Sequence, residues 1–123
     1  MQTKPITSFR AVGVDAETVE PLFEFHNILD GDPKQTGFVT DTEPKGVFVT
    51  GIWACTPGKY QVDQYHANCY EFGHILEGKV RVTDHEGDSA IYQAGDTIVT
   101  PKGFKGTWEV LEPIRKVFAV YNC

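Results

Sequence analysis

A glutamine, a histidine and a glutamate lie close together near the middle of the sequence and could do chemistry as a group. Gln64 and His66 are two positions apart, so in a β-strand both side chains point to the same face of the sheet. Glu71, on the stretch that follows, brings a carboxylate back toward them. A neutral imidazole nitrogen and carboxylate oxygens are ligands that divalent zinc, manganese, nickel or iron accepts. The spacing therefore predicts one divalent metal held by Gln64, His66 and Glu71.

The same residues have a second interpretation that needs no metal. Only His66 and Glu71 are strong ligands, and two strong ligands rarely hold a transition metal against the buffering of a cell. In this interpretation His66 and Glu71 form a hydrogen-bonded pair that lines a polar cavity and acts as an acid–base couple. The small number of strong ligands weighs against the metal without deciding the matter. In both interpretations the predicted catalytic residues are His66 and Glu71.

Aromatic side chains are candidates to line a pocket around this group. Trp53, Tyr60 and Trp108 are amphipathic aromatic residues of the kind that contact small ligands, although places in the core would explain them equally well. Lys59, Arg115 and Lys116 could bind an anionic ligand, but we expect them on a solvated face. The sequence has no glycine-flanked serine elbow, phosphate-binding glycine loop or dinucleotide fingerprint. Covalent catalysis, phosphoryl transfer and hydride transfer therefore have no support.

The elements that must position these residues are short β-strands. From residue 46 onward, β-branched and aromatic residues occur in short runs separated by turn sequences. The expected strands cover 47–55, 75–76, 79–83, 90–92, 97–100, 107–111 and 116–121. The last run is apolar on both faces, so it should be central or covered. No long window keeps a helical period, and the pattern predicts an all-β sandwich or closed barrel.

The first 45 residues differ from the rest and predict an irregular N-terminal arm, with the barrel formed by 46–123. Residues 15–18 can cap a short helical turn that a proline then limits. Residues 30–33 and Thr36-Gly37 have turn compositions. We expect this arm to pack on the barrel or on a partner chain.

Two clusters of residues resemble the two sequence motifs of the cupin superfamily. The first contains Gly58, Gln64-Tyr65-His66, Glu71 and Gly78, and the second contains Gly95, Pro101 and Gly103. Segments 53–59, 75–78, 94–96 and 106–116 resemble more closely the small cupins related to the ureidoglycine aminohydrolase cupin domain. The resemblance covers about residues 46 to 121. It implies a single cupin-type antiparallel β-barrel, that is, a jelly roll or double-stranded β-helix.

The chain departs from the superfamily pattern at two ligand positions. Gln64 stands where a metal-binding cupin has its first histidine, and Gly106 stands where the second motif supplies its last histidine. The resemblance implies a polar barrel pocket and a metal-assisted aminohydrolase- or isomerase-like enzyme acting on a small nitrogen-rich or carbonyl-bearing metabolite. The departures support the alternative, a metal-free cupin that binds a small molecule or serves as an accessory module. A purely structural subunit is the third hypothesis.

Charge and composition restrict the partners. The chain of 123 residues has 11 lysines and arginines against 17 acids, a net charge of −6, so phosphate backbones and anionic membranes repel it. We therefore expect a small-molecule ligand, with no nucleic acid and no membrane as partners. The cysteines at 55, 69 and 123 suit a reducing compartment, and no secretory leader is evident, which predicts a cytoplasmic location. We also predict a homodimer. Sheet edges and an apolar outer face need covering, and cupins commonly form two-fold dimers.

Overall fold

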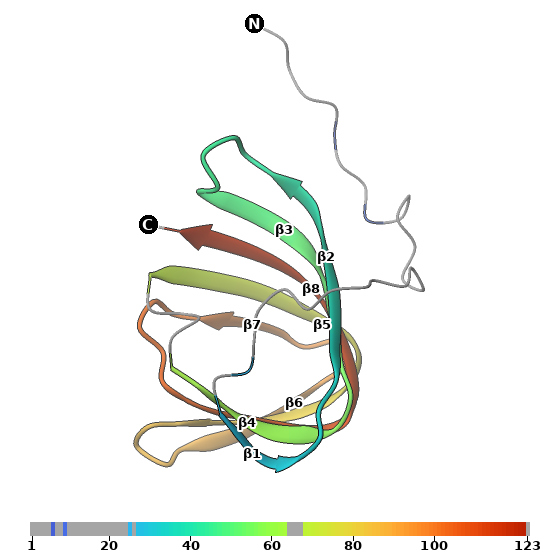
Figure 1. Cartoon of the computed structure of the whole chain (residues 1–123), viewed down its shortest axis with the longest axis vertical. Helices are drawn as coiled ribbons and strands as arrows, with labels where there is room; N and C mark the ends of the chain where they lie inside the picture. Colours follow the sequence, from blue (N-terminus) through green and yellow to red (C-terminus); the bar gives the residue numbers. More distant parts are fainter. Residues whose placement is uncertain (1–5, 7–8, 10–24, 26, 64–67, 123) are drawn as a thin grey trace, which may run out of the picture.

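The structure, a computed structural model, describes residues 6, 9, 25, 27–63 and 68–122. These residues form strands that curve round a common interior (Figure 1). The strands are β1 (Ile28–Gly31), β2 (Gln35–Thr42), β3 (Phe48–Cys55), β4 (Gly58–Val62), β5 (Cys69–Asp84), β6 (Ser89–Gln93), β7 (Thr97–Thr100) and β8 (Gly106–Asn122). A helix long and apolar enough to cross a membrane is not found in this part of the chain.

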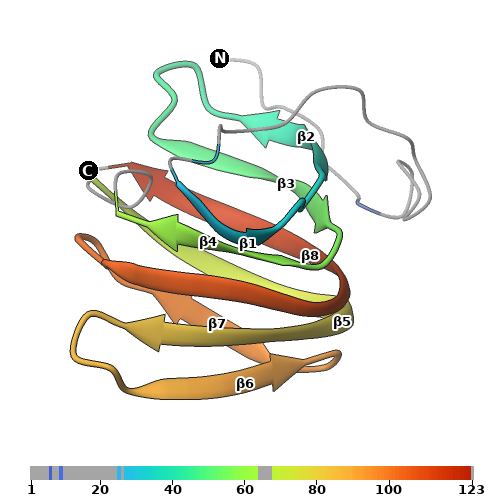
Figure 2. The same ribbon diagram turned by 60° about the horizontal axis from the view of Figure 1, so that its bottom comes forward.

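The eight strands form one antiparallel sheet in which β8 is the central strand. The first half of β8 pairs with β4 and the second half with β3, while β5 follows the opposite edge of β8 along nearly its whole length. β1 and β2 extend the sheet beyond β4 and β3, and β6 and β7 pair with β5 (Figure 2). The central place of β8 confirms what its apolar residues on both faces predict. The cupin-type barrel expected from the sequence is also confirmed.

β5 and β8 change register where the two halves of the barrel meet. The register shifts occur between Ile75 and Val80, and Gly78 in this bulge has a φ of 92°. A Cβ atom on Gly78 would overlap the carbonyl oxygen of Pro113, so this close approach of two backbones requires glycine. The bend does not interrupt either strand. The runs 107–111 and 116–121, predicted as separate strands, are parts of the single strand β8.

Part of the segment expected as an arm belongs to the sheet. β1 pairs with β4 and β2 pairs with β3, although both lie within the first 45 residues. The turn predicted at Thr36-Gly37 is wrong, because these residues lie inside β2 opposite Ala54 and Trp53. Paired backbone groups, rather than local turn propensity, decide the conformation there. The helical turn expected at 15–18 lies outside the described residues.

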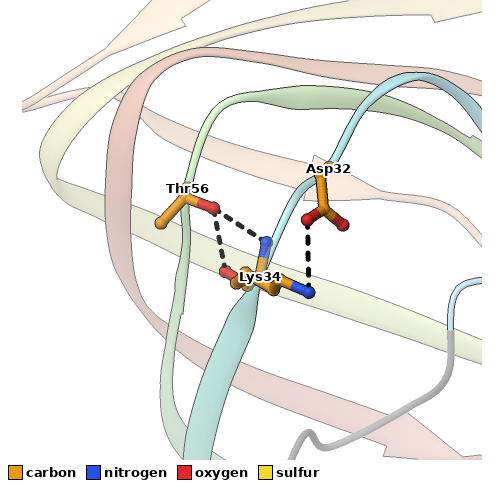
Figure 3. Close-up of polar contacts among 3 residues, drawn as sticks. All are labelled: Asp32, Lys34 and Thr56. Atoms are coloured by element: carbon orange, nitrogen blue, oxygen red, sulfur yellow. Dashed lines mark hydrogen bonds and ion pairs between the residues drawn. The ribbon is translucent and has the colours of Figure 1, made fainter.

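The link between β1 and β2 is hydrogen-bonded to the turn that follows β3 (Figure 3). The backbone N–H of Lys34 donates to Thr56 Oγ1 at 2.8 Å, and the backbone N–H of Thr56 donates to the carbonyl oxygen of Lys34 at 2.9 Å. Lys34 Nζ also lies 3.3 Å from Asp32 Oδ2, but both side chains are largely exposed, so this ion pair contributes little. The hydrogen bonds between Lys34 and Thr56 therefore hold the two links together.

Apolar side chains fill most of the interior. Ile75, Val80, Val110 and Ile114 are fully buried around the bend of β5 and β8. Cys55 and Cys69 are buried members of the same core cluster, as their apolar sequence context predicts. This packed core supports the polar residues of the interior.

Candidate functional site

A charged pair lies inside the barrel. Lys116 Nζ, on β8, lies 2.6 Å from Glu71 Oε2, on β5, and the two residues are only 6% and 5% exposed. An ammonium group that donates to a carboxylate at this distance compensates the charge of both groups. Removing either partner would leave a buried charge without compensation. The two residues therefore act as one unit.

The alternation of side chains along two strands directs this pair inward. Glu71 occupies an inward position of β5, between the exposed residues Tyr70 and Phe72. Lys116 occupies an inward position of β8, two residues before buried Phe118. Because successive side chains of a strand point to opposite faces, the sheet pairing of β5 with β8 makes the two charged groups meet in the interior.

Two tryptophan rings contact the ammonium group of Lys116. Lys116 Nζ lies 4.8 Å from the ring centroid of Trp53 and 4.4 Å from that of Trp108, both within the range of cation–π attraction. The two indoles meet edge to face, with centroids 6.0 Å apart and an interplanar angle of 84°. Trp53 lies opposite Lys116 in the pairing of β3 with β8. Each tryptophan therefore presents its ring to the charge.

The two indole N–H groups differ in their partners. Trp53 Nε1 donates to Gln35 Oε1 at 2.8 Å. Trp108 Nε1 is buried and has no hydrogen-bond partner in the described part of the chain. A buried donor without an acceptor costs free energy, and native proteins seldom leave one unless a water or ligand completes it. This donor belongs to the ring that also contacts Lys116.

A thiol and a hydroxyl complete the polar neighbourhood. Burial raises the pKa of the Cys55 thiol to about 12, and the positive charge of Lys116 opposes this shift only in part. Cys55 is therefore a neutral thiol at physiological pH and a poor nucleophile. Thr100 of β7 is buried and lies directly opposite Glu71 in the sheet. Among the described residues, the interior thus contains one buried ion pair, with a neutral thiol and a hydroxyl near it.

The predicted site residues do not all lie at one place in the structure. Trp53 and Trp108 come together on Lys116, and Tyr60 is buried with its ring centroid 4.4 Å from that of Phe25. Glu71 faces the interior. Gln64 and His66 lie outside the described residues, so their predicted roles as ligands, and that of His66 in catalysis, stay predictions.

Lys116 is the functional residue that the sequence interpretation misses. The expectation of a solvated face is wrong for Lys116, whereas Arg115 points outward with its guanidinium 3.8 Å from Glu77. Adjacent strand residues must face opposite sides, so one of these two basic residues had to be inside. The buried alternate positions of β8 supply the signal, since Lys116 is in phase with Ile114 and Phe118.

The remaining histidines lie away from the charged pair. His74 faces the opposite side of β5 from Glu71, where its Nδ1 lies 2.8 Å from Thr97 Oγ1. His85 is exposed in the turn after β5, with its Nε2 3.9 Å from the Glu86 carboxylate. His26 lies outside the described residues. His74 therefore has a structural role and His85 is solvated, as is usual for histidines at such positions.

The described residues do not fit a metal in this interior. Glu71 is the carboxylate available, and the ammonium group of Lys116 already binds it. In the described part of the chain no three His, Cys, Asp or Glu side chains gather in a metal-binding arrangement. Gly106, which replaces the last histidine of the motif, has no room for any side chain, because a Cβ atom would overlap the carbonyl oxygen of Thr83. A histidine ligand at this position is excluded by the backbone itself.

Comparison with known protein families gives one assignment. The profile of the EutQ-like cupin domain matches residues 42–118, which is more than half of the chain. The chain belongs to this cupin family. Comparison with curated proteins gives no significant match.

Solved structures of other cupins share the fold of this EutQ-like cupin. The Clostridium difficile EutQ protein is 16% identical with a TM-score of 0.63, over 74% of this chain and 64% of that protein, so the match leaves about a third of EutQ uncovered. A DUF861 family protein from Thermotoga maritima is 37% identical with a TM-score of 0.51, over 55% of this chain and 73% of that protein. Ectoine synthase from P. lautus is 10% identical with a TM-score of 0.66, over 97% of this chain and 78% of that enzyme.

Proposed function

We propose that this protein is a metal-independent cupin that binds a small, neutral, polar molecule beside Glu71 and Lys116. The observation that carries the proposal is the 2.6 Å contact between the ammonium and carboxylate groups, because this pair is a strong dipole with no net charge. The ammonium group of Lys116 occupies the position beside the Glu71 carboxylate that a metal ion would need. The overlap at Gly106 adds a steric reason against a metal.

Charge balance defines the ligand class. A ligand with a net charge would bring an uncompensated charge into the interior, which is costly. A neutral amide or ureide matches the site better, because its carbonyl oxygen accepts from the Trp108 indole N–H and from Lys116, and its N–H groups donate to Glu71. Such a ligand would satisfy the buried indole donor. This class agrees with the nitrogen-rich or carbonyl-bearing metabolite that the family resemblance implies.

A second candidate function is catalysis on the same ligand class. The short distance between Lys116 and Glu71 allows a proton to pass between them, as aminohydrolase- or isomerase-like chemistry requires. In this version Glu71 takes a proton from the bound substrate and Lys116 stabilises negative charge that develops on the carbonyl oxygen. We also propose a cytoplasmic location, which the free thiols of buried Cys55 and Cys69 support because such thiols suit a reducing compartment.

The test combines metal analysis with ligand binding. Untagged protein purified without chelator is first measured for zinc, manganese, nickel and iron, and then titrated calorimetrically with propionamide and methylurea beside propionate and propylamine. We expect no stoichiometric metal and binding of the neutral compounds only. Trp108→Phe keeps an aromatic ring but removes the indole N–H donor, and should weaken binding by about 3- to 10-fold, the value of one hydrogen bond. Tyr121→Phe, which removes one donor from the outer surface, is the control.

Three outcomes would contradict the proposal. Stoichiometric metal that disappears in a His66→Ala variant would restore the metal site of Gln64, His66 and Glu71. A preference for the charged compounds would refute the argument from charge balance. Failure to bind any of the four compounds would remove the evidence for this ligand class. Slow conversion of a bound amide or ureide, lost in Glu71→Gln, would favour the catalytic candidate.

A further inference from the structure

Gly73 is a buried glycine beside the charged pair, at a position where the backbone itself does not require glycine. It follows Glu71 by two residues on β5, so both residues are directed to the inner face of the strand. Its φ lies outside the left-handed region, and its pairing with Phe118 and Ile98 is regular, because the register shifts of β5 begin only after Ile75. A glycine inside a strand weakens it, and usually marks a bulge, a bend, or the close approach of another backbone or a ligand. A bulge does not explain Gly73.

The backbone of the described residues does not crowd Gly73 either. Among these residues, the atoms nearest to a Cβ placed on Gly73 are Lys116 Cδ at 3.6 Å, the Val117 carbonyl oxygen at 3.8 Å and Glu71 Oε2 at 3.9 Å. These are ordinary van der Waals distances, so an alanine would fit without any movement of its neighbours. The close approach of a ligand is the explanation that remains.

Gly51, at the same level of the barrel, has the structural reason that Gly73 lacks. Gly51 of β3 and Gly73 of β5 lie on opposite sides of Phe118 in the central strand β8, and these three strands are neighbours in Figure 1. A Cβ on Gly51 would lie 2.6 Å from Cζ of the Phe118 ring and would overlap the carbonyl oxygen of Phe38. The space at Gly51 is therefore filled by the core, whereas the space at Gly73 adjoins Glu71 and Lys116.

The atoms around the space at Gly73 favour an N–H donor. Its two polar neighbours, Glu71 Oε2 and the Val117 carbonyl oxygen, are both acceptors, and Lys116 contributes a methylene group. An amide nitrogen therefore suits this space, and a carbonyl oxygen would be repelled. The buried indole N–H of Trp108, which has no partner among the described residues, belongs to a ring 4.4 Å from Lys116 Nζ and can take the carbonyl oxygen. The two ends of a small amide thus find complementary groups along one lysine side chain.

We infer that Gly73 leaves room for the unsubstituted amide nitrogen of the ligand, so that the site selects a terminal carbamoyl group, CONH2. The inference rests on the proposed binding of a neutral amide or ureide, and it adds which end of that ligand faces Gly73. The space takes a group the size of a methyl in ordinary contact, which matches an NH2 group and excludes an alkyl substituent on the nitrogen. The ligand class is therefore primary amides and terminal ureides, and secondary and tertiary amides are rejected.

Filling the space with a methyl group tests the role of Gly73. Gly73→Ala should weaken the binding of propionamide by about tenfold or more in calorimetry, because the methyl group and the amide nitrogen compete for one space. Its thermal midpoint should stay the same or rise, because alanine fits this strand position and restricts the unfolded chain. Gly51→Ala is the control for stability and should lower the thermal midpoint. Ala119→Val is the control for binding, because it adds methyl groups opposite exposed Phe72, outside the barrel, and should bind propionamide as wild type does.

A substituted ligand tests the same space in the unaltered chain. N-methylpropionamide should bind wild type about tenfold more weakly than propionamide, because its extra methyl group has no room beside Gly73. Equal binding of these two compounds, undiminished binding of propionamide by Gly73→Ala, or a thermal midpoint lowered in Gly73→Ala as in Gly51→Ala would each overturn the inference and leave the proposed function in place. A wild type that binds neither propionamide nor methylurea would refute the proposed function, and this inference with it.

Discussion

The two halves of β5 differ in which kinds of side chain face the interior and the solvent. Between Lys79 and Asp84 the arrangement is the usual one, with Val80 buried in the core and Arg81 outside, 2.8 Å from Glu109 of β8. Between Cys69 and Ile75, which are both buried, the arrangement is inverted at two positions: the charged residue Glu71 is inside and Phe72 is exposed. The same strand, with the same neighbour β8, therefore contains an ordinary half and an unusual half.

The difference teaches where to look for function. A buried charge and a large exposed apolar surface are the two observations that burial statistics do not explain, and here they occupy the two faces of one short stretch. These two observations support the proposal that the inner face of the first half of β5 serves ligand binding.

Removing one member of the buried pair should give the largest effect. Lys116→Met leaves the Glu71 carboxylate buried without its partner, which we expect to lower the free energy of unfolding by about 3–5 kcal/mol in urea denaturation. The double variant Glu71→Gln, Lys116→Met should recover most of this loss. A single variant as stable as wild type would show that the pair is not buried as a unit.

The tight backbone contact at Gly106 should give the next largest effect. Gly106 lies opposite Asp84, at the end of the conventional half of β5, where a methyl group would overlap the Thr83 carbonyl oxygen. We expect Gly106→Ala to destabilise the protein by about 1–3 kcal/mol, as overpacking does. If Gly106→His were stable and bound zinc in calorimetry, the steric argument against a metal ligand here would fail.

The Cys55 thiol should make stability fall at alkaline pH. Its pKa is about 12 in the folded chain against an ordinary 9.0, so the unfolded chain loses this proton first as the pH rises. The free energy of unfolding should therefore decrease between pH 9 and 12, and Cys55→Ala should remove this part of the decrease. Urea denaturation of both proteins across this range provides the measurement. Equal pH dependence of the two proteins would contradict the assignment.

The surface pair in the conventional half should give the smallest effect. Arg81 and Glu109 are both partly exposed, and an ion pair of this kind contributes about 0.2–1 kcal/mol. Arg81→Ala should thus lower the urea midpoint only slightly, and added salt should reduce the difference from wild type further. A loss as large as that of Lys116→Met would abolish the contrast between the two halves of β5.

The contrast also explains how much the sequence could predict. The strands expected at 47–55, 79–83 and 97–100 agree closely with β3, the second half of β5, and β7, because turn sequences bound these short runs of β-branched and aromatic residues. The first half of β5 was indicated only at 75–76, because a glutamate between two aromatic residues conceals which face is buried. Lys116 was misplaced for the same reason, since charge normally argues for exposure. Glu71, Trp53 and Trp108 could be predicted as site residues, but their partner Lys116 could not, because a buried lysine breaks the rule that predicts the fold.

The central position of β8 has a consequence for how the chain reaches its folded state. Without β8 the described strands fall into three groups, namely β1 with β4, β2 with β3, and β5 with β6 and β7, and no backbone pairing joins one group to another. A pair of strands is marginally stable in water, and a group of three needs a covered hydrophobic face to be stable by itself. Folding should therefore occur in one cooperative step, in which β8 docks between these groups and makes contacts with residues more than fifty positions earlier in the chain. Such long loops are slow to close, so we expect this small barrel to fold on the millisecond-to-second scale rather than in microseconds.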